Sequence, residues 1–402
     1  MYIQEFIFYG ILLFFLVRYF YICIRYPFWA HMPVYHTYDY HNYFASTCRE
    51  MQLFPYKNKY TNAIQVKTIS YYELNDTYIK YFAELLQCFY IPSDTLLYTI
   101  VEKDVRARMV GHFDTPFISF YNEKNYVSTA PTSEKQFDIL NTSVEIQLFP
   151  EPKGCIASYP VHIFYRGEYK SANYYTFIAC DRTSTAVSRN LISTHDYNSR
   201  RHNPNVRVGL LKKDVGICEG VVPLIEFTTG LYHIITNKTK QRMKNIVEVY
   251  RQNWGVMFDL LLGANSLYDF VVRIDVGAVK ARIEAEILFV YAICERGNVL
   301  AMYFIEDAHT LYEQTTEKTV RLVASINNGL TGEIFYQGFL ECFRKLQKRN
   351  LDFKRLLVDN IGHNSIVANQ MPGLIEETAG AYYFINWLFP HKLQREKVFI
   401  FV

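Results

Sequence analysis

The sequence lacks the cysteine spacings that hold metal ions or staple small domains together. Its eight cysteines are scattered irregularly over 402 residues, and no two of them form a Cys-x-x-Cys pair. This pattern excludes the common zinc motifs and a disulfide scaffold, and it favours a reducing compartment for the body of the protein. We therefore expect no metal site.

Long runs of Lys and Arg are also absent, and the formal net charge at pH 7 is only +3. Proteins that bind nucleic acid usually carry a dense basic stripe, so we expect no nucleic acid among the partners. Core material, in contrast, is abundant: 50% of the residues are apolar and 17% are aromatic. A chain of this length can build one large unit or two fused ones.

One long apolar run, Phe6–Ile24, lies near the N-terminus and is interrupted only by Gly10 and Arg18. As a helix it would be roughly 28 Å long, close to the thickness of the hydrocarbon core of a bilayer. Arg18 lies toward the C-terminal end of the run, where its long side chain can reach the membrane surface. Two interpretations remain open: a membrane anchor, and a buried or amphipathic helix of the core.

The flanking residues favour an anchor with a defined orientation. Glu5 stands where a cleaved signal peptide carries a basic residue, and no small-x-small cleavage site follows the run. Arg18 and Arg25 follow the run and no Lys or Arg precedes it, so the positive-inside rule places the C-terminal side in the cytoplasm. The sequence thus predicts a single-pass membrane protein, with residues 1–25 as the anchor and a cytoplasmic body.

The body combines strand and helix patterns. Aromatic and β-branched stretches predict two hairpins, and apolar residues at helical spacing predict two long helices. The hairpins are expected at Ile156–Tyr165 with Tyr174–Cys180, and at Ile287–Cys294 with Val299–Ile305. One helix is expected to be capped by Asn75 or Asp76, with an apolar face that runs from Ile79 to Phe89, and the other is expected at Gly332–Arg349. Each half mixes hairpins with helices, so we predict an α+β fold of two similar units.

The stretch Arg25–Val34 joins the anchor to the body and packs three aromatic residues and two prolines into ten positions. Proline fixes φ and removes a backbone donor, so we expect an extended segment whose rings pack against the domain. An aromatic linker on the domain surface would have the same composition, and that interpretation stays open.

This stretch resembles the opening motif of the protein N-myristoyltransferases, Tyr-x-Phe-Trp-x-Thr-Gln-Pro-Val. The matching residues are Tyr26, Phe28, Trp29, Pro33 and Val34. Further landmarks follow in the family's order. Gly154–Pro160 resembles its Gly-Phe-Ile-Ser-Ala-Ile-Pro strand, Phe177-Ile178 its Phe-Leu pair, and Tyr382–Trp387 its Tyr-Tyr-Leu-Tyr-Asn-Trp element.

The resemblance covers residues 26 to 402 and implies two GNAT-like halves in tandem, the fold of acyl-CoA N-acyltransferases, preceded by the hydrophobic helix. The implied ranges are 26–237 for an acyl-CoA-binding half and 238–402 for the second half. The family transfers a myristoyl group from myristoyl-CoA to an N-terminal glycine. Acyl-CoA would then be a co-substrate, with no permanently bound cofactor.

The resemblance also implies roles for single residues. The backbone N–H groups of Phe177 and Ile178 would stabilise the oxyanion formed at the thioester carbonyl. The C-terminal carboxylate of Val402 would accept the proton of the attacking ammonium group. The tail after Val398 is one residue shorter than in typical members.

Acyl-CoA contacts are implied at two places. One is the aromatic segment, with Tyr26, Phe28 and Trp29. The other is the loop and helix start at 182–189, which stands where the family has Leu-Arg-Ser-Lys-Arg-x-Ala. The segment 182–189 keeps hydroxyl groups and two arginines, so the resemblance implies phosphate contacts from Arg182, Ser184 and Arg189. It lacks the closely spaced basic residues of the family's loop.

On the acceptor side, the resemblance implies His233, Asn327, Glu377 and Tyr382 as substrate-binding residues; Glu377 replaces the acidic residue of the family's Gly-Asp-Gly turn. His233 could equally be structural. Three functions remain open: acylation of N-terminal glycines, acylation of another acceptor, and a membrane-tethered binding or structural protein without catalysis. The matched order of motifs from Tyr26 onward favours the first of these functions and makes it our leading hypothesis. The loss of basic residues from the phosphate loop and the short tail favour the last.

Overall fold

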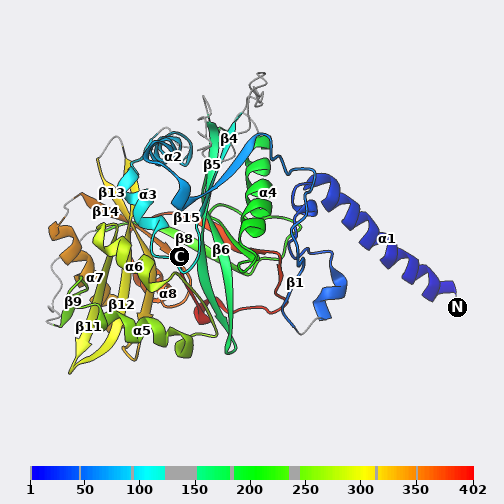
Figure 1. The fold of residues 1–402 in the computed structure, drawn as a ribbon. Helices are drawn as coiled ribbons and strands as arrows, with labels where there is room; N and C mark the ends of the chain where they lie inside the picture. The colour runs from blue at the N-terminus through cyan, green and yellow to red at the C-terminus, as the bar shows by residue number, and fades with distance from the viewer. Residues whose placement is uncertain are drawn as a thin grey trace, which may run out of the picture.

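The computed structural model describes residues 2–44, 47–91, 95–122, 152–181, 185–234, 245–312, 316–349 and 352–402. One large mixed sheet runs through these residues, helices cover both of its faces, and α1 (Tyr2–Arg25) projects from one side (Figure 1). Along the sheet the strands follow the order β17-β10-β5-β6-β7-β15-β8-β14-β13-β12-β11-β9.

The first half is built around the predicted hairpin of β5 (Pro152–Tyr165) and β6 (Glu168–Cys180). Alternate residues of β5 face opposite sides of the sheet: Ala157 packs with α2 (Asp76–Phe89), and Ile156 packs with α4 (Thr185–His202). The predicted cap of α2 is confirmed, because the Asn75 side chain accepts the Tyr78 N–H at 3.0 Å.

The second half repeats this design. The predicted hairpin is β11 (Leu288–Glu295) with β12 (Asn298–Tyr312), followed by β13 (Lys318–Asn327), α7 (Gly332–Arg349) and the parallel strand β14 (Phe353–Asp359). The buried face of α7 packs on one side of this sheet with Tyr291 and Tyr303, forming a second core.

Late strands complete the sheet of the first half. β15 (Leu374–Ile385) lies between β7 (Val208–Lys213) and β8 (Ile225–His233), and β17 (Val398–Phe401) joins β5 through β10 (Phe270–Arg273). The junction proposed between residues 237 and 238 falls outside the described residues, so the division into two ranges stays a prediction.

The remaining elements are short or cover the edges. They are β1 (Arg49–Glu50) with β16 (Trp387–Leu388), β2 (Val66–Ser70) with β4 (Phe117–Asn122), β3 (Leu96–Tyr98), β9 (Ile246–Glu248), α3 (Glu102–Met109), α5 (Gly255–Leu267), α6 (Val276–Glu284) and α8 (Asn364–Gln370).

Helix α1 is long and apolar enough to cross a membrane, and only 6% of its most apolar window is buried. Length and composition of this kind fit an anchor and also a signal sequence near the N-terminus. The apolar side chains of Phe6, Phe14 and Phe20 are 81%, 60% and 57% exposed. An apolar helix this bare needs a partner outside the folded body.

Candidate functional site

A cavity of about 260 Å³ lies where the C-terminal end of α1 meets the beginning of α4. It is lined by Arg25, Tyr26, Pro27, Phe28, Trp29, Ser188, Arg189 and Ile192. The structure therefore brings together four residues that the sequence predicted as acyl-CoA contacts: Tyr26, Phe28, Trp29 and Arg189.

The aromatic segment is not extended, and that prediction was wrong. Phe28 has helical dihedral angles, φ −65° and ψ −55°, and a 3₁₀ turn follows at Trp29–His31. The N–H groups of His31 and Met32 donate to the carbonyls of Phe28 and Trp29 at 3.1 and 3.0 Å. A proline φ near −65° suits a tight turn as well as an extended strand, and local hydrogen bonds decide between the two here.

The rings of the segment pack against the domain, as predicted. Phe28 is buried and meets Trp29 and Tyr60 edge to face, with ring centroids 4.9 and 5.2 Å apart. Trp29 stacks on Tyr383 of β15 at 6.5 Å. These contacts fix one wall of the cavity, because each ring is held by a second one.

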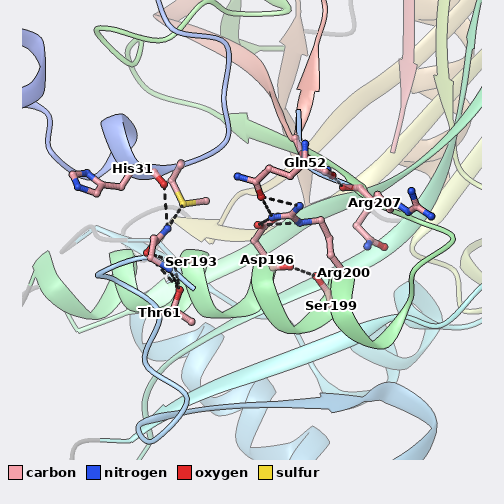
Figure 2. Close-up of polar contacts among 12 residues, drawn as sticks. His31, Gln52, Thr61, Ser193, Asp196, Ser199, Arg200 and Arg207 are labelled. Atoms are coloured by element: carbon pink, nitrogen blue, oxygen red, sulfur yellow. Dashed lines mark hydrogen bonds and ion pairs between the residues drawn. The ribbon is translucent and has the colours of Figure 1, made fainter. Parts of the chain in front are cut away.

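Polar contacts tie this wall to α4 (Figure 2). The Asn58 amide donates to the His31 carbonyl at 3.3 Å, and Ser193 of α4 donates to the Asn58 amide oxygen at 2.9 Å. The Thr61 hydroxyl lies 3.2 Å from that of Ser193. The two walls of the cavity are thus joined through one asparagine.

Helix α4 is itself fixed by a buried ion pair. Arg200 Nη2 lies 2.6 Å from Asp196 Oδ2, with side chains only 2% and 4% exposed (Figure 2). Tyr175 of β6 donates to the other Asp196 oxygen at 2.7 Å. A buried pair needs such extra hydrogen bonds to offset its desolvation, so the network holds α4 in one position against the sheet.

The start of α4 is the expected phosphate site. Arg189 lies near the N-terminal end of the helix, where the helix dipole favours anions. Arg182 and Ser184, predicted for the same role, lie outside the described residues.

Strand β6 carries a bulge at the predicted oxyanion residues. Phe177 and Ile178 together oppose the single residue Ile156 of β5, and Phe177 has φ 55°, in the left-handed region. β6 pairs with β7 only over Ala172–Tyr175, and beyond that point it has no strand partner on this side among the described residues. A bulge leaves its extra residue out of the regular ladder of hydrogen bonds, so these two residues are distinct from the rest of the strand. Their role at an oxyanion stays a prediction.

The chain end is fixed within the body. Phe401 accepts the N–H of Ile274 at 2.9 Å, and its ring lies against Phe304 with centroids 4.4 Å apart. Val402 is half-buried and packs on the main core. Val402, whose carboxylate the resemblance implies as the base, therefore directly follows a strand that is fixed in the sheet. Its role as a base stays a prediction.

The acceptor-side candidates are spread along the sheet. Tyr382 is buried on β15 beside Lys212, whose ammonium group lies 5.9 Å from its ring. Glu377, on the same strand, is exposed and pairs in register with Gly230 of β8. Tyr382 follows Glu377 by five positions along the strand, about 17 Å.

His233 and Asn327 have structural partners of their own. His233 Nε2 lies 3.6 Å from Glu317, which also accepts a hydrogen bond from Arg355 at 2.8 Å. The Asn327 side chain donates to the Leu330 carbonyl and accepts the Leu330 N–H, both at 2.9 Å. Asn327 thereby shapes the turn into α7, and the structure does not bring it to His233.

The sequence did not predict a charged cluster on the central strands. Lys212 Nζ lies 2.7 Å from Asp359 and 2.8 Å from Asp214, and Arg321 lies 3.7 Å from Asp214. Thr229 donates to the second Asp359 oxygen at 2.7 Å. These residues come from distant stretches of sequence, and no short motif could reveal their contact.

The cationic partners decide the charge of both carboxyl groups. Burial alone would raise the pKa of Asp214, but Lys212 and Arg321 outweigh it and lower this pKa to about 2. The same two cations lower the pKa of Asp359 against its own burial. Asp214, which directly follows β7, nevertheless keeps 48% of its side-chain surface accessible.

A second ion pair borders the bulge. Arg108 lies 2.7 Å from Glu306 of β12, and its guanidinium stands over the Phe177 ring at 5.7 Å. Arg282 approaches the same Glu306 oxygen at 3.8 Å. Among the described residues no group of three His, Cys, Asp or Glu side chains could hold a metal ion, and the expectation of no metal site stays a prediction.

Comparison with known proteins defines the fold. No family model matches the chain, and no curated protein matches its sequence. In structure it is similar to N-myristoyltransferase of Saccharomyces cerevisiae with bound myristoyl-CoA, with a TM-score of 0.65 and 9% identity over 92% of this chain and 97% of the yeast chain. A yeast structure with bound myristoyl-CoA and inhibitors gives a TM-score of 0.66 and 9% identity, covering 92% of each chain.

These matches establish an acyltransferase-type α+β architecture of two GNAT-like halves in tandem, preceded by an apolar helix. The particular arrangement is the N-myristoyltransferase fold in a divergent form, as the sequence resemblance predicted. At 9% identity the likeness extends to the fold and not to individual residues.

Proposed function

We propose that this protein is a membrane-anchored acyltransferase that transfers myristate from myristoyl-CoA to an N-terminal glycine. The cavity between α1 and α4 supports this proposal most directly, because it joins the aromatic segment to Arg189 at a helix start. The yeast protein of the same fold was crystallised with myristoyl-CoA. In the proposed orientation α1 spans the membrane once and the body faces the cytoplasm.

Each part of the site has a proposed task in binding. The rings of Tyr26, Phe28 and Trp29 would contact the acyl-CoA, and Arg189 would hold its phosphates with Arg182 and Ser184. On the acceptor side we propose Tyr382 and Glu377 from β15, with His233 and Asn327 at the ends of β8 and β13.

The proposed reaction takes its residue roles from the family resemblance. The terminal amine attacks the thioester carbonyl, and the N–H groups of Phe177 and Ile178 stabilise the oxyanion. The proton of the amine passes to the Val402 carboxylate. Collapse of the intermediate breaks the carbon–sulfur bond, and CoA leaves as a thiolate that takes up a proton while the amide remains on the acceptor.

A protein that binds without catalysis is the alternative. It is favoured by the acceptor-side geometry, since Asn327 uses its side chain on Leu330 and Tyr382 lies about 17 Å from Glu377 along β15. An acyltransferase with a different acceptor fits the same observation. In both alternatives the cavity at α4 still binds acyl-CoA. They differ from the main proposal in whether the acyl group is transferred and in which acceptor receives it.

The deciding experiment incubates the full chain in detergent or vesicles with myristoyl-CoA and a peptide that begins with glycine. Myristoylated peptide and free CoA are expected by mass spectrometry, and an Nα-acetylated copy of the peptide should stay unmodified. Binding of myristoyl-CoA without transfer would favour the binding protein. Absence of both binding and transfer would overturn the proposal.

A variant with a longer C-terminal end tests whether the Val402 carboxylate is the base. One residue added after Val402 moves the terminal carboxylate, so acyl transfer should be abolished while myristoyl-CoA binding persists. An unchanged rate of transfer would remove Val402 from the mechanism.

A further inference from the structure

Helix α1 is fixed to the body at its C-terminal end. Ile22 is buried, and a Cβ atom built on Gly220 would lie 2.6 Å from Ile22 Cγ2, so the loop before β8 touches the helix directly. Four residues further on, the Tyr26 hydroxyl donates to the Glu219 carboxylate. The orientation of α1 relative to the body is therefore set by packing and by a hydrogen bond.

A second segment, Tyr35–Asn42, folds back along the same helix. The ring of Tyr38 lies 5.0 Å from that of Tyr19, and the ring of Tyr40 lies 4.5 Å from that of Phe15. Asp39 accepts the His36 N–H at 3.0 Å, which holds the turn that brings these tyrosines to α1. The last turns of α1 thus have aromatic neighbours from the body on one side.

The charges of α1 define the depth at which it can sit in a membrane. The long side chain of Arg18 reaches the bilayer surface from inside the apolar run, and the residues before it, from Tyr2, form a helix of about 24 Å with Glu5 in its first turn. This is shorter than a hydrocarbon core of about 30 Å, and a short span draws its flanking residues into the interface. Tyrosine is enriched at that level, where Tyr19 and Tyr38 meet.

The cavity between α1 and α4 lies just beyond the level of Arg18 at the bilayer surface. Arg25, which lines it, follows Arg18 by seven residues, or roughly 10 Å along the helix. The polar layer on each side of a bilayer is about 5–8 Å thick. With α1 fixed to the body, the cavity cannot move far from that layer.

We propose that α1 and the segment Tyr35–Asn42 dock the body on the bilayer with this cavity at the outer edge of the headgroup layer, so that acyl-CoA enters it from the membrane. The acyl chain then moves from the lipid into the protein while the phosphates stay at headgroup level, beside Arg25 and Arg189. The identity of the ligand and the membrane span of α1 rest on the proposed function; the depth of the cavity at the bilayer goes beyond it. Anionic lipids strengthen the docking through the same arginines.

Tryptophan fluorescence tests the position of the cavity. The chain has three tryptophans, so the double variant Trp254→Phe/Trp387→Phe leaves Trp29 alone, and Trp29→Phe/Trp387→Phe leaves Trp254, which precedes α5 away from α1 (Figure 1). Both full-length variants are reconstituted in phosphatidylcholine vesicles that contain a lipid spin-labelled on its headgroup. Quenching several-fold stronger for Trp29 than for Trp254 is expected; equal quenching would overturn the docking.

Trp387 is buried, so its loss could prevent folding. The single variants Trp29→Phe and Trp254→Phe then give the same comparison: the total quenching should fall in the first and persist in the second. Persistence in both would contradict the proposed position.

The delivery route needs its own measurement. Myristoyl-CoA is preloaded either into the vesicles that carry the protein or into protein-free vesicles mixed with them, at equal total concentration. Binding should be several-fold faster in the first case, and equal rates would show uptake from water and refute membrane delivery. Quenching of Trp29 without any binding of myristoyl-CoA would reject the proposed function and support the docking. Binding of myristoyl-CoA without quenching of Trp29 would reject the docking and leave the proposed function standing.

Discussion

Lys212 is the least accessible member of the central charged cluster, with only 5% of its side chain exposed. Its ammonium group depends on two carboxylates that differ in burial: Asp359 is 9% exposed and Asp214 is 48% exposed. Removing one partner of a buried pair costs far more than removing an exposed one, because the remaining charge stays desolvated.

We therefore expect Asp359→Asn to lower the free energy of unfolding by about 3–5 kcal/mol. Asp214→Asn should lower it much less, because Lys212 keeps Asp359 and water reaches position 214. Urea denaturation of the two variants measures the difference. Equal losses would mean that burial does not decide the strength of these ion pairs.

Arg189 offers a test of the cavity. Hydrogen bonds to charged groups contribute roughly 1.5–3 kcal/mol, so Arg189→Ala should weaken CoA-ester binding by about tenfold or more. Arg201 lies on the same helix but outside the cavity, and Arg201→Ala should leave the affinity unchanged. Calorimetric titration with myristoyl-CoA compares the affinities of the two variants. Similar losses of affinity would mean that the ligand does not bind in this cavity.

Among the elements, α7 shows how closely a helix can approach a sheet. A Cβ atom on Gly338 would collide with the Ile293 side chain and lie 2.8 Å from the Tyr303 hydroxyl. That hydroxyl donates to the Phe335 carbonyl of the same helix at 2.6 Å. The missing side chain at Gly338 therefore sets the distance between α7 and the hairpin β11–β12.

Gly338→Ala should destabilise the protein, although alanine is favoured over glycine inside helices by about 1 kcal/mol. A Cβ atom added to Gly263 in α5 would meet no atom within 4 Å among the described residues, so Gly263→Ala should stabilise by up to that amount. Thermal unfolding of both variants shows whether each substitution raises or lowers the melting temperature. Stabilisation by both substitutions would show that α7 can shift without cost.

The sequence predicted well those elements whose ends are marked by residues next to them in the chain, such as turn and cap residues. The hairpin β5–β6 has its turn at Arg166 and Gly167, both with positive φ, and α2 has its cap at Asn75. The 3₁₀ turn after Phe28 was missed because proline restricts φ alone and leaves the choice of ψ to hydrogen bonding. The cluster around Lys212 was missed because its members meet only when distant stretches of chain are folded.

At the scale of the whole molecule, three buried or half-buried histidines link folding to pH. Burial lowers the pKa of His112 to about 4, of His195 to about 3 and of His363 to about 4. His195 bonds to the hydroxyls of Ser119 and Ser158, at 2.7 and 2.8 Å. These rings stay neutral in the folded protein, whereas unfolded histidine takes up a proton near pH 6.5.

Because the unfolded chain then binds more protons, the stability that these groups contribute is present above pH 6.5 and is lost as the pH falls toward 4. Each histidine should remove about 1.4 kcal/mol per pH unit in that window. Urea denaturation at a series of pH values measures the slope. His195→Gln removes one such group and should reduce the slope by that amount; an unchanged slope would contradict the assignment.

The position of β15 between β7 and β8 has a consequence for biosynthesis. Strands from the stretch that begins at Leu374 close the sheet of the first half, so that half cannot be completed until this stretch has been synthesised. Helix α1 precedes the body in the chain and, in the proposed anchoring, can meet a membrane while the body is still unfolded. Targeting would then precede folding, and premature termination before β15 would leave two bare strand edges tethered at a lipid surface.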